Sequence, residues 1–349
     1  MVIKAKVTLL ALLMVFVFGC SKQDKSVKPV VLQEAFQTER NDTANVDSPA
    51  FWAGANGERW IITTAKKGDQ LFVNDAENGH LIKMAGKMGS GPGELLRPNG
   101  IFVIDNYAIV VERDNHRVQV FDLPDFNSVL IFGDDKLVKP YGIFVYKPDS
   151  STYRVYVTDN YETASGDVPA DSLLGKRVHI FDIHSGDAKL TSTYEKAFGA
   201  TSGPGTLRIV ESIWGDVENN KLLIAEEDVT QSSVKVYDLD GNFTGTVFGK
   251  GIFKTQVEGI AIYKNNNAGY WFVTDQSKTD NRYVVFDRNS FEYLGAFAGK
   301  NTSNTDGIWL TKVQMTGFTK GAFYALNNDG NVSAFDLKSI ADSLKLNLE

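Results

Sequence analysis

The sequence predicts an all-β fold, a six-bladed β-propeller with four-stranded blades around a central channel. First, a unit that ends in an alternating strand followed by Phe-Asp or Tyr-Asp recurs along the chain, and such alternation is typical of half-buried strands. Second, the opening strands of successive units lie about 42 to 50 residues apart, with one longer interval, which is the period of a propeller blade. Third, 31 Gly, 22 Phe and 13 Tyr against a single Cys favour a turn-rich β protein without disulfides.

The units follow one another along the chain. Their opening strands centre on Trp52, Phe102, Phe144, Trp214, Ala261 and Trp309. Their clearest closing strands end at Asp122, Asp182, Asp238, Asp287 and Asp336. The long interval between Phe144 and Trp214 predicts an insertion at residues 161–175, with a second excursion at 189–205. Residues 30–36 precede the first unit and are expected to pair with the last blade, which closes the ring and removes an exposed sheet edge.

The first 29 residues predict export and anchoring. Lys4 and Lys6 precede an apolar run at 7–18 that is too short to span a bilayer, so residues 1–19 are predicted to be a signal peptide. Gly19 directly before Cys20 resembles the lipobox of bacterial lipoproteins, which implies that Cys20 is lipidated; an ordinary cleaved signal is the alternative. Residues 20–29 then form a tether and 30–349 a single propeller domain, located at a bacterial cell envelope and lipid-anchored.

The charge balance limits the partners. With 36 basic and 43 acidic side chains the net charge is −7, which excludes a nucleic-acid partner because phosphate backbones are held by surplus Lys and Arg. A polyanionic substrate would need positive charge from another source.

Acidic residues recur where successive units meet the channel mouth. Several carboxylates held together repel one another unless a cation lies among them, and oxygen ligands without clustered Cys or His select Ca²⁺ or Mg²⁺. We expect calcium; ordinary solvated acidic loops are the alternative. The candidate ligands are Asp47, Glu211, Glu226, Glu227, Asp228, Glu258 and Asp306.

Six short strings carry a family resemblance. They occupy residues 47–52, 62–68, 141–143, 223–228, 257–263 and 302–308. In this order they resemble the successive strings of the β-propeller phytases, and they cover most of the chain after residue 46. The resemblance implies a calcium-dependent phosphohydrolase, a 3-phytase-like enzyme that acts on myo-inositol hexakisphosphate. A monomer is expected from the closed propeller fold alone. Metal ions would bridge carboxylates to phosphate oxygens and supply an activated water, which reconciles the acidic charge with an anionic substrate.

The resemblance also assigns roles to residues. It implies that Glu211, Glu227 and Glu258 are catalytic, because they hold calcium and the attacking water. It implies that phosphate is bound by the polar and basic residues Lys66, Lys67, Arg113, Tyr141 and Gln276.

This sequence departs from the family pattern at several positions. Gly100 stands where the family has an Asp, Asn160 replaces a phosphate-binding Lys, and Ser212 replaces a Gly after Glu211. Ser48 and Asn304 likewise replace Asp. These losses leave three alternatives open: the site holds fewer calcium ions, the substrate is a less charged phosphate ester, or the protein does not hydrolyse phosphate esters.

A second resemblance indicates other functions. Residues 89–95, 97–101 and 114–121 are similar to the NHL-type propeller repeat, and 202–207 echo it. NHL-type propellers imply a non-catalytic, lipid-anchored module that binds a protein or glycan. A calcium-dependent lactonase-type propeller with one channel-bound Ca²⁺ is a further alternative. The four His residues lack zinc-binding spacing, and no Gly-x-Ser-x-Gly elbow occurs.

Overall fold

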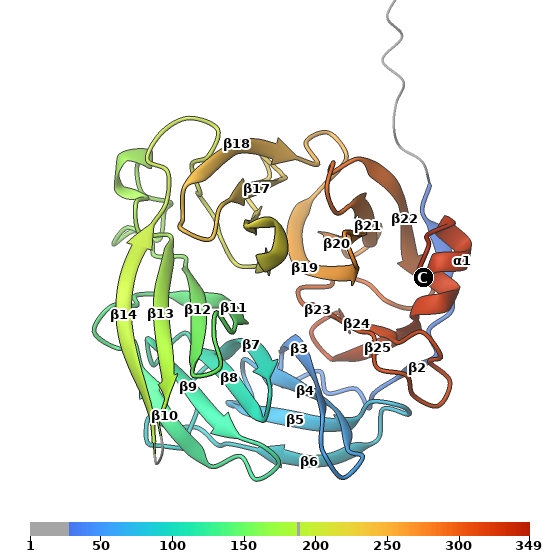
Figure 1. Cartoon of the computed structure of the whole chain (residues 1–349), viewed down its shortest axis with the longest axis horizontal. Helices are drawn as coiled ribbons and strands as arrows, with labels where there is room; N and C mark the ends of the chain where they lie inside the picture. Colours follow the sequence, from blue (N-terminus) through green and yellow to red (C-terminus); the bar gives the residue numbers. More distant parts are fainter. Residues whose placement is uncertain (1–27, 187–188) are drawn as a thin grey trace, which may run out of the picture.

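Six four-stranded units arranged in a ring confirm the predicted six-bladed β-propeller (Figure 1). A computed structural model of the chain describes residues 28–186 and 189–349. The predicted signal peptide, Cys20 and most of the predicted tether lie outside these residues. Within the described ranges, no helix has the length and apolar character needed to cross a membrane.

Each blade is an antiparallel sheet whose strands run outwards from the channel in chain order. Blades 1 to 3 consist of β3 (Val46–Ala53), β4 (Arg59–Ala65), β5 (Gln70–Asp75) and β6 (Leu81–Ala85); β7 (Pro98–Ile104), β8 (Tyr107–Glu112), β9 (Arg117–Asp122) and β10 (Ser128–Phe132); and β11 (Pro140–Tyr146), β12 (Thr152–Asp159), β13 (Val178–Ser185) and β14 (Leu190–Phe198). Blades 4 to 6 consist of β15 (Ile213–Asp216), β16 (Lys221–Glu226), β17 (Ser233–Tyr237) and β18 (Phe243–Phe248); β19 (Gln256–Asn265), β20 (Ala268–Gln276), β21 (Arg282–Asp287) and β22 (Tyr293–Gly299); and β23 (Ile308–Thr311), β24 (Ala322–Asn327) and β25 (Asn331–Asp336), with an outer strand from the N-terminal side.

The N-terminal segment closes the ring in two places. β2 (Phe36–Gln37) pairs antiparallel with β25 and supplies the fourth strand of blade 6. β1 (Val30–Leu32) pairs parallel with β22 and adds a fifth strand to blade 5. Pairing with the last blade was predicted for all of residues 30–36, but the structure divides the segment between the last two blades.

The connections also refine the prediction. The insertion expected at 161–175 lies between β12 and β13 and contains the 3-10 helix η1 (Asp171–Leu173). The excursion expected at 189–205 is instead mainly the outer strand β14, followed by a turn. A second 3-10 helix, η2 (Val217–Asn219), follows β15. The helix α1 (Leu337–Leu344) follows β25, and the Asp336 side chain caps it by accepting from the Lys338 and Ser339 backbone N–H groups.

The innermost strands approach one another closely at a ring of small residues. In blades 1, 2, 3 and 5 the register between the first and second strands shifts at this point, as it does at a β-bulge. A Cβ atom at Gly100 would lie 2.5 Å from the Tyr141 carbonyl oxygen of the next blade, and one at Gly307 would lie 2.8 Å from that of Asp47. The small residues are Ser48, Gly100, Gly142, Ser212, Gly259 and Gly307. Backbone packing between blades therefore explains their size.

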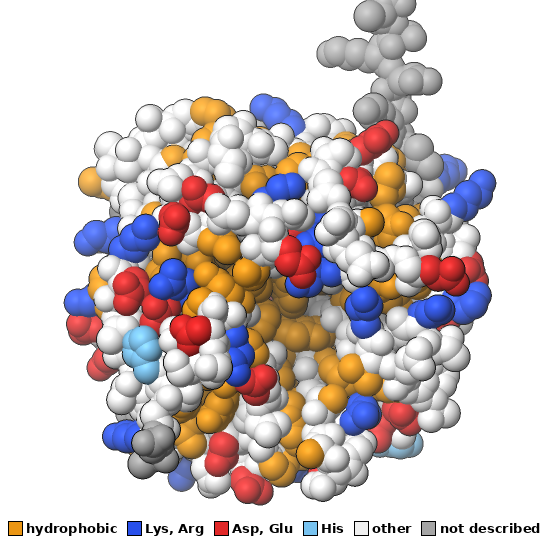
Figure 2. All heavy atoms as spheres, in the orientation of Figure 1, with side chains coloured by type: hydrophobic (Ala, Val, Ile, Leu, Met, Phe, Trp, Pro, Cys, Tyr) orange, Lys and Arg blue, Asp and Glu red, His pale blue; other side chains and the backbone are white. Residues whose placement is uncertain are grey.

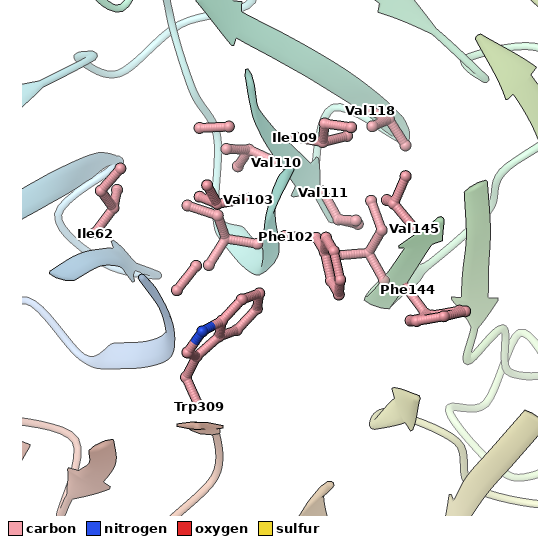
Figure 3. Packing of buried hydrophobic residues seen from close by; sticks show 14 of the residues in the cluster. Ile62, Phe102, Val103, Ile109, Val110, Val111, Val118, Phe144, Val145 and Trp309 are labelled. Atoms are coloured by element: carbon pink, nitrogen blue, oxygen red, sulfur yellow. The ribbon is translucent and has the colours of Figure 1, made fainter. Parts of the chain in front are cut away.

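Aromatic side chains from alternate blades fill the channel below this ring. The ring centroids of Phe102, Trp214 and Trp309 lie 5.1–5.3 Å apart in all three pairs. Figure 3 shows Phe102 and Trp309 near one another at the ring centre, and Figure 2 shows hydrophobic side chains gathered in the central hollow. Because blades 2, 4 and 6 supply these rings, they meet on the propeller axis and close the channel.

In four of the six blades a carboxylate fastens the incoming segment to its blade. In blade 4, Glu226 at the end of the second strand accepts the backbone N–H groups of Arg208 and Ile209 at 2.8 and 3.0 Å and pairs with Lys235 at 2.8 Å. Comparable carboxylates at the ends of three other second strands are Glu112, Asp159 and Asp275. These buried groups have hydrogen-bond partners, as buried charges require.

The blade 3 pair of Asp159 and His179 predicts a pH-dependent stability. The His179 Nε2 atom lies 3.5 Å from Asp159 Oδ2, and both side chains are buried. Burial, with the nearby charge of Lys176, lowers the pKa of His179 to about 4. The unfolded chain therefore binds a proton at His179 near pH 6.5 whereas the folded chain does not, so stability is full above pH 6.5 and falls towards pH 4.

We expect about 1–3 kcal/mol of unfolding free energy to be lost between pH 7 and 5 because of this histidine. Urea unfolding at both pH values measures it. His179→Phe should flatten the pH dependence, whereas substitution of the exposed His80 by Gln should leave it unchanged. Equal pH dependence in wild type and His179→Phe would contradict the prediction. Burial raises the pKa of Asp159, and this change acts against the His179 effect as the pH falls.

Candidate functional site

Two rings of side chains, one residue from each blade in each ring, define the mouth of the channel. The first ring lies just before the small residues of the innermost strands and consists of Asp47, Asn99, Tyr141, Glu211, Glu258 and Asp306. The second ring lies at or just after the end of each second strand and consists of Lys66, Arg113, Asn160, Glu227, Gln276 and Asn328. The repeat therefore places twelve polar positions at one end of the ring.

Three glutamates form a compact cluster at this mouth. Ligand oxygens of Glu211, Glu227 and Glu258 all lie within 4.8 Å of one another. Glu227 and Glu258 are buried and Glu211 is half-buried. They come from blades 4 and 5, and Glu227 belongs to the second ring whereas the other two belong to the first.

Burial and mutual repulsion make these carboxyl groups reluctant to ionise. Burial raises the pKa of Glu211 to about 8, with a further contribution from the negative charge of Asp47. Burial, followed by the negative charge of Glu211, also raises the pKa of Glu227 well above its usual range, and the same holds for Glu258. Burial and Asp47 raise the pKa of Asp306 to about 7. A cation among these oxygens would relieve the repulsion.

Lys66 neutralises the neighbouring side of the mouth. Its Nζ lies 2.5 Å from Asp47 Oδ1 and 3.4 Å from both Asp306 Oδ2 and the Tyr141 hydroxyl. Burial would lower the pKa of Lys66, but Asp47 and Asp306 outweigh burial and raise it. Gln276 donates from Nε2 to Asp306 Oδ1. Lys66 is thus charged and bound between blades 1, 3 and 6.

The space between these groups is small. Asp47, Tyr141, Glu211, Glu258 and Asp306 line a cavity of about 30 Å³, which is room for an ion and a water molecule and not for a whole organic substrate. A substrate would have to present one group at the mouth.

The glutamate cluster fits a hard divalent cation. Within residues 28–186 and 189–349, Glu227 Oε1 is buried without any hydrogen-bond partner, which is costly unless an ion or water contacts it. The donors are all carboxylate oxygens, which are the ligands that calcium prefers. The residues present therefore suit calcium.

Two predicted ligands lie elsewhere. The structure does not bring Glu226 and Asp228 into the cluster. Glu226 fastens the incoming segment of blade 4 and pairs with Lys235. Asp228 pairs with Arg208 at 2.8 Å and accepts from Thr230. The structure does bring together the remaining five, Asp47, Glu211, Glu227, Glu258 and Asp306.

The predicted phosphate-binding residues differ in position. Lys66, Tyr141 and Gln276 contact one another or Asp306 at the mouth. Arg113 is 22% exposed and its Nε contacts Asp114 Oδ1 at 2.7 Å, so its two terminal nitrogens are left for other contacts. Lys67 is exposed.

The surroundings of three residues that depart from the family pattern are visible in the structure. Gly100 leaves no room for a larger residue beside the Tyr141 carbonyl, so an Asp there would require the blades to separate. Ser48 donates its hydroxyl to Asp47 Oδ2 at 3.0 Å. Asn304 has a left-handed backbone with φ of 46°, which Asn tolerates better than most residues.

Sequence reasoning missed Asn99. It holds the blade 2 position of the first ring, and the signal was available, because Asn99-Gly100 matches Glu258-Gly259 and Asp306-Gly307 in the repeat.

Two family models match this chain, and they agree with the fold and give a coarse indication of function. Residues 207–345 match the Phytase family, and residues 53–169 match a family described as 6-bladed beta-propeller. Comparison with curated proteins gives no match. Among solved structures, a chain of Kuenenia stuttgartiensis hydrazine synthase is similar at a TM-score of 0.49 and 14% identity, covering 88% of this chain and 81% of that chain.

The Phytase match spans blades 4 to 6, which carry all three clustered glutamates and Asp306. The chain is a six-bladed β-propeller that resembles the phytase family.

Proposed function

We propose that this chain is a calcium-dependent phosphomonoesterase that releases phosphate from inositol phosphates. The observation that carries the proposal is the cluster of Glu211, Glu227 and Glu258, whose oxygens lie within 4.8 Å of one another at the mouth. The likeness to the phytase family over the same blades supports it.

Under this proposal, each residue at the mouth has a distinct role. Glu211, Glu227 and Glu258 would hold calcium and orient the attacking water. When bound, calcium supplies positive charge that attracts phosphate oxygens and favours ionisation of water. Tyr141 lines the small cavity and its hydroxyl lies 3.4 Å from Lys66 Nζ, and both side chains would donate hydrogen bonds to the phosphate oxygens. The narrow mouth favours one phosphate group entering while the rest of the substrate stays outside.

Phosphate release from phytate over a calcium series, with a chelator at the zero point, tests the proposal. We expect release that requires calcium and that Glu258→Gln removes. Glu292→Gln is the matched control, because Glu292 is exposed beside β22 on the outside of the ring. A protein that binds calcium by elemental analysis but releases no phosphate from phytate or simpler phosphate esters would refute the proposal.

One observation favours a second candidate, a calcium-dependent lactonase with a single ion. Within the described part of the chain, one group of three carboxylates meets the geometry of a metal site. One bound calcium together with lactone hydrolysis, and no phosphate release, would support this candidate instead.

A further inference from the structure

Arg97 has an unusual backbone at the edge of the mouth. It lies two residues before Asn99 of the first ring, and its φ is 50°. Asn45 and Asn304 hold the same place in blades 1 and 6 with similar φ values, and Asn tolerates this conformation more readily than Arg does. A left-handed Arg costs about 1 kcal/mol or more, and such residues concentrate at functional sites.

Hydrogen bonds from both sides fix this backbone. The Arg97 N–H donates to Asp69 Oδ1 at 2.7 Å, and the Arg97 carbonyl accepts from the Arg113 N–H at 3.1 Å. Arg97 thus lies between blade 1 and the second-ring residue of blade 2, and its side chain begins at a fixed point.

The guanidinium of Arg97 makes no ion pair or hydrogen bond with any residue that the structure describes, and its Nε is buried. The other arginines of the blade interiors differ. Arg117, Arg282 and Arg288 each pair with a buried carboxylate at 2.5–2.8 Å. A buried guanidinium donor without an acceptor is unfavourable, and its planar set of donors suits an oxyanion.

Asn99 provides a second, independent observation. It is fully buried, and neither Oδ1 nor Nδ2 has a hydrogen-bond partner among the described residues. Its carbonyl accepts from Thr64 Oγ1 at 2.6 Å, so the backbone that carries the amide is fixed. A fully buried amide without partners is unfavourable unless a water molecule, an ion or a ligand takes up its hydrogen bonds.

The two residues lie opposite the negative charge. Blade 2 is three positions round the ring from blade 5, which carries Glu258. The carboxylates without a basic partner belong to blades 4 and 5, whereas blades 1 and 2 carry Lys66, Arg97 and Arg113. An anion at the mouth is therefore drawn towards blade 2.

We propose that Arg97 and Asn99 form an oxyanion-binding pair that holds phosphoryl oxygens of the substrate against blade 2, an inference that rests on the proposed function for the identity of the anion. The guanidinium donates to two oxygens. The Asn99 Nδ2 donates to the same group, and its Oδ1 accepts from a protonated phosphate oxygen. The pair positions the phosphoryl group and takes no part in bond cleavage.

Binding of inorganic phosphate tests this pair without calcium and without turnover. Wild type, Arg97→Gln, Arg97→Lys and Asn99→Ala are titrated with inorganic phosphate in a chelating buffer and followed by ³¹P NMR. We expect Arg97→Gln to weaken binding about tenfold or more and Arg97→Lys to recover part of it. Arg59→Gln, at the opposite end of β4, is the control and should bind as wild type does.

Thermal unfolding of each variant establishes that it is folded. If Asn99→Ala does not fold, the phosphate affinity of Arg97→Gln alone tests the inference. Wild-type affinity in Arg97→Gln, or binding that is lost only in Arg113→Gln, would overturn the inference, as would a wild type that does not bind phosphate. Because the titration needs no hydrolysis, phosphate binding through Arg97 in a protein that hydrolyses nothing would refute the proposed function and not this inference.

Discussion

Glu227→Gln is expected to abolish calcium-dependent phosphate release, by at least about 100-fold, while it stabilises the protein in the absence of calcium. The glutamine keeps the size of the side chain but removes the charge that a cation needs. Burial raises the pKa of Glu227, so this carboxyl group lowers stability: the loss is absent below pH 4.5, grows as the pH rises above that value, and is constant above the folded pKa. Removing the charge at pH 7.5 should therefore raise the free energy of unfolding by about 1–2 kcal/mol.

Three measurements on the same preparations check this result: calcium titration by calorimetry, phosphate release, and urea unfolding in chelator. Glu292→Gln should match wild type in all three. Glu226→Gln, at the adjacent position, should lower the unfolding free energy instead, because Lys235 would lose its buried partner. Calcium affinity equal to wild type in Glu227→Gln, or a loss of stability in chelator, would contradict the prediction.

Arg288→Met is expected to destabilise the ring by about 3–5 kcal/mol. Arg288 follows β21 in blade 5 and is fully buried, with its Nη2 2.5 Å from Asp216 Oδ1 and from Glu218 Oε2 in blade 4. Burial would raise the pKa of Asp216, but hydrogen bonds from Arg288 and Asn219 lower it overall. Without Arg288, the Asp216 carboxylate is buried and uncompensated, and the bridge between the two blades is lost.

Urea unfolding measures this loss, and Lys338→Met serves as the matched control. Lys338 forms an exposed ion pair with Asp342 on α1, and such a pair contributes at most about 0.5 kcal/mol. Arg288→Lys should lie between wild type and Arg288→Met, because an ammonium cannot form both contacts of the planar group. Equal stability of the Arg288→Met and Lys338→Met variants would show that the bridge contributes nothing.

The repeat made the fold predictable. In five of the six blades the third strand ends at or near Phe-Asp or Tyr-Asp, as at Phe121-Asp122 and Phe286-Asp287, so the period could be read directly. The expected half-burial of these strands was wrong: they are buried along nearly their whole length, because the neighbouring blades cover both faces of each sheet. The division of residues 30–36 between two blades could not be read, because β1 and β2 are too short for a pairing partner to be specified by their own pattern.

Part of the site was also predictable. Glu211, Glu258 and Asp306 precede a small residue in equivalent repeats, and the structure places them at one mouth. Glu226 and Glu227 could not be separated by sequence, because adjacent residues at the end of a strand point to opposite sides. Glu226 accepts backbone N–H groups of its own blade, whereas Glu227 joins the cluster at the channel mouth. Arg97 gave no signal, since its left-handed backbone and missing partners exist only in the folded ring.

The contacts among Phe102, Trp214 and Trp309 close the channel on the propeller axis, so the polar mouth is its open end. Whatever enters from the polar side has to leave the same way, so arrival and departure are consecutive events and cannot overlap. Under the proposed function, the product and the next substrate would pass through this one opening. Release of the product would then have to precede binding of the next substrate, and its rate would limit turnover.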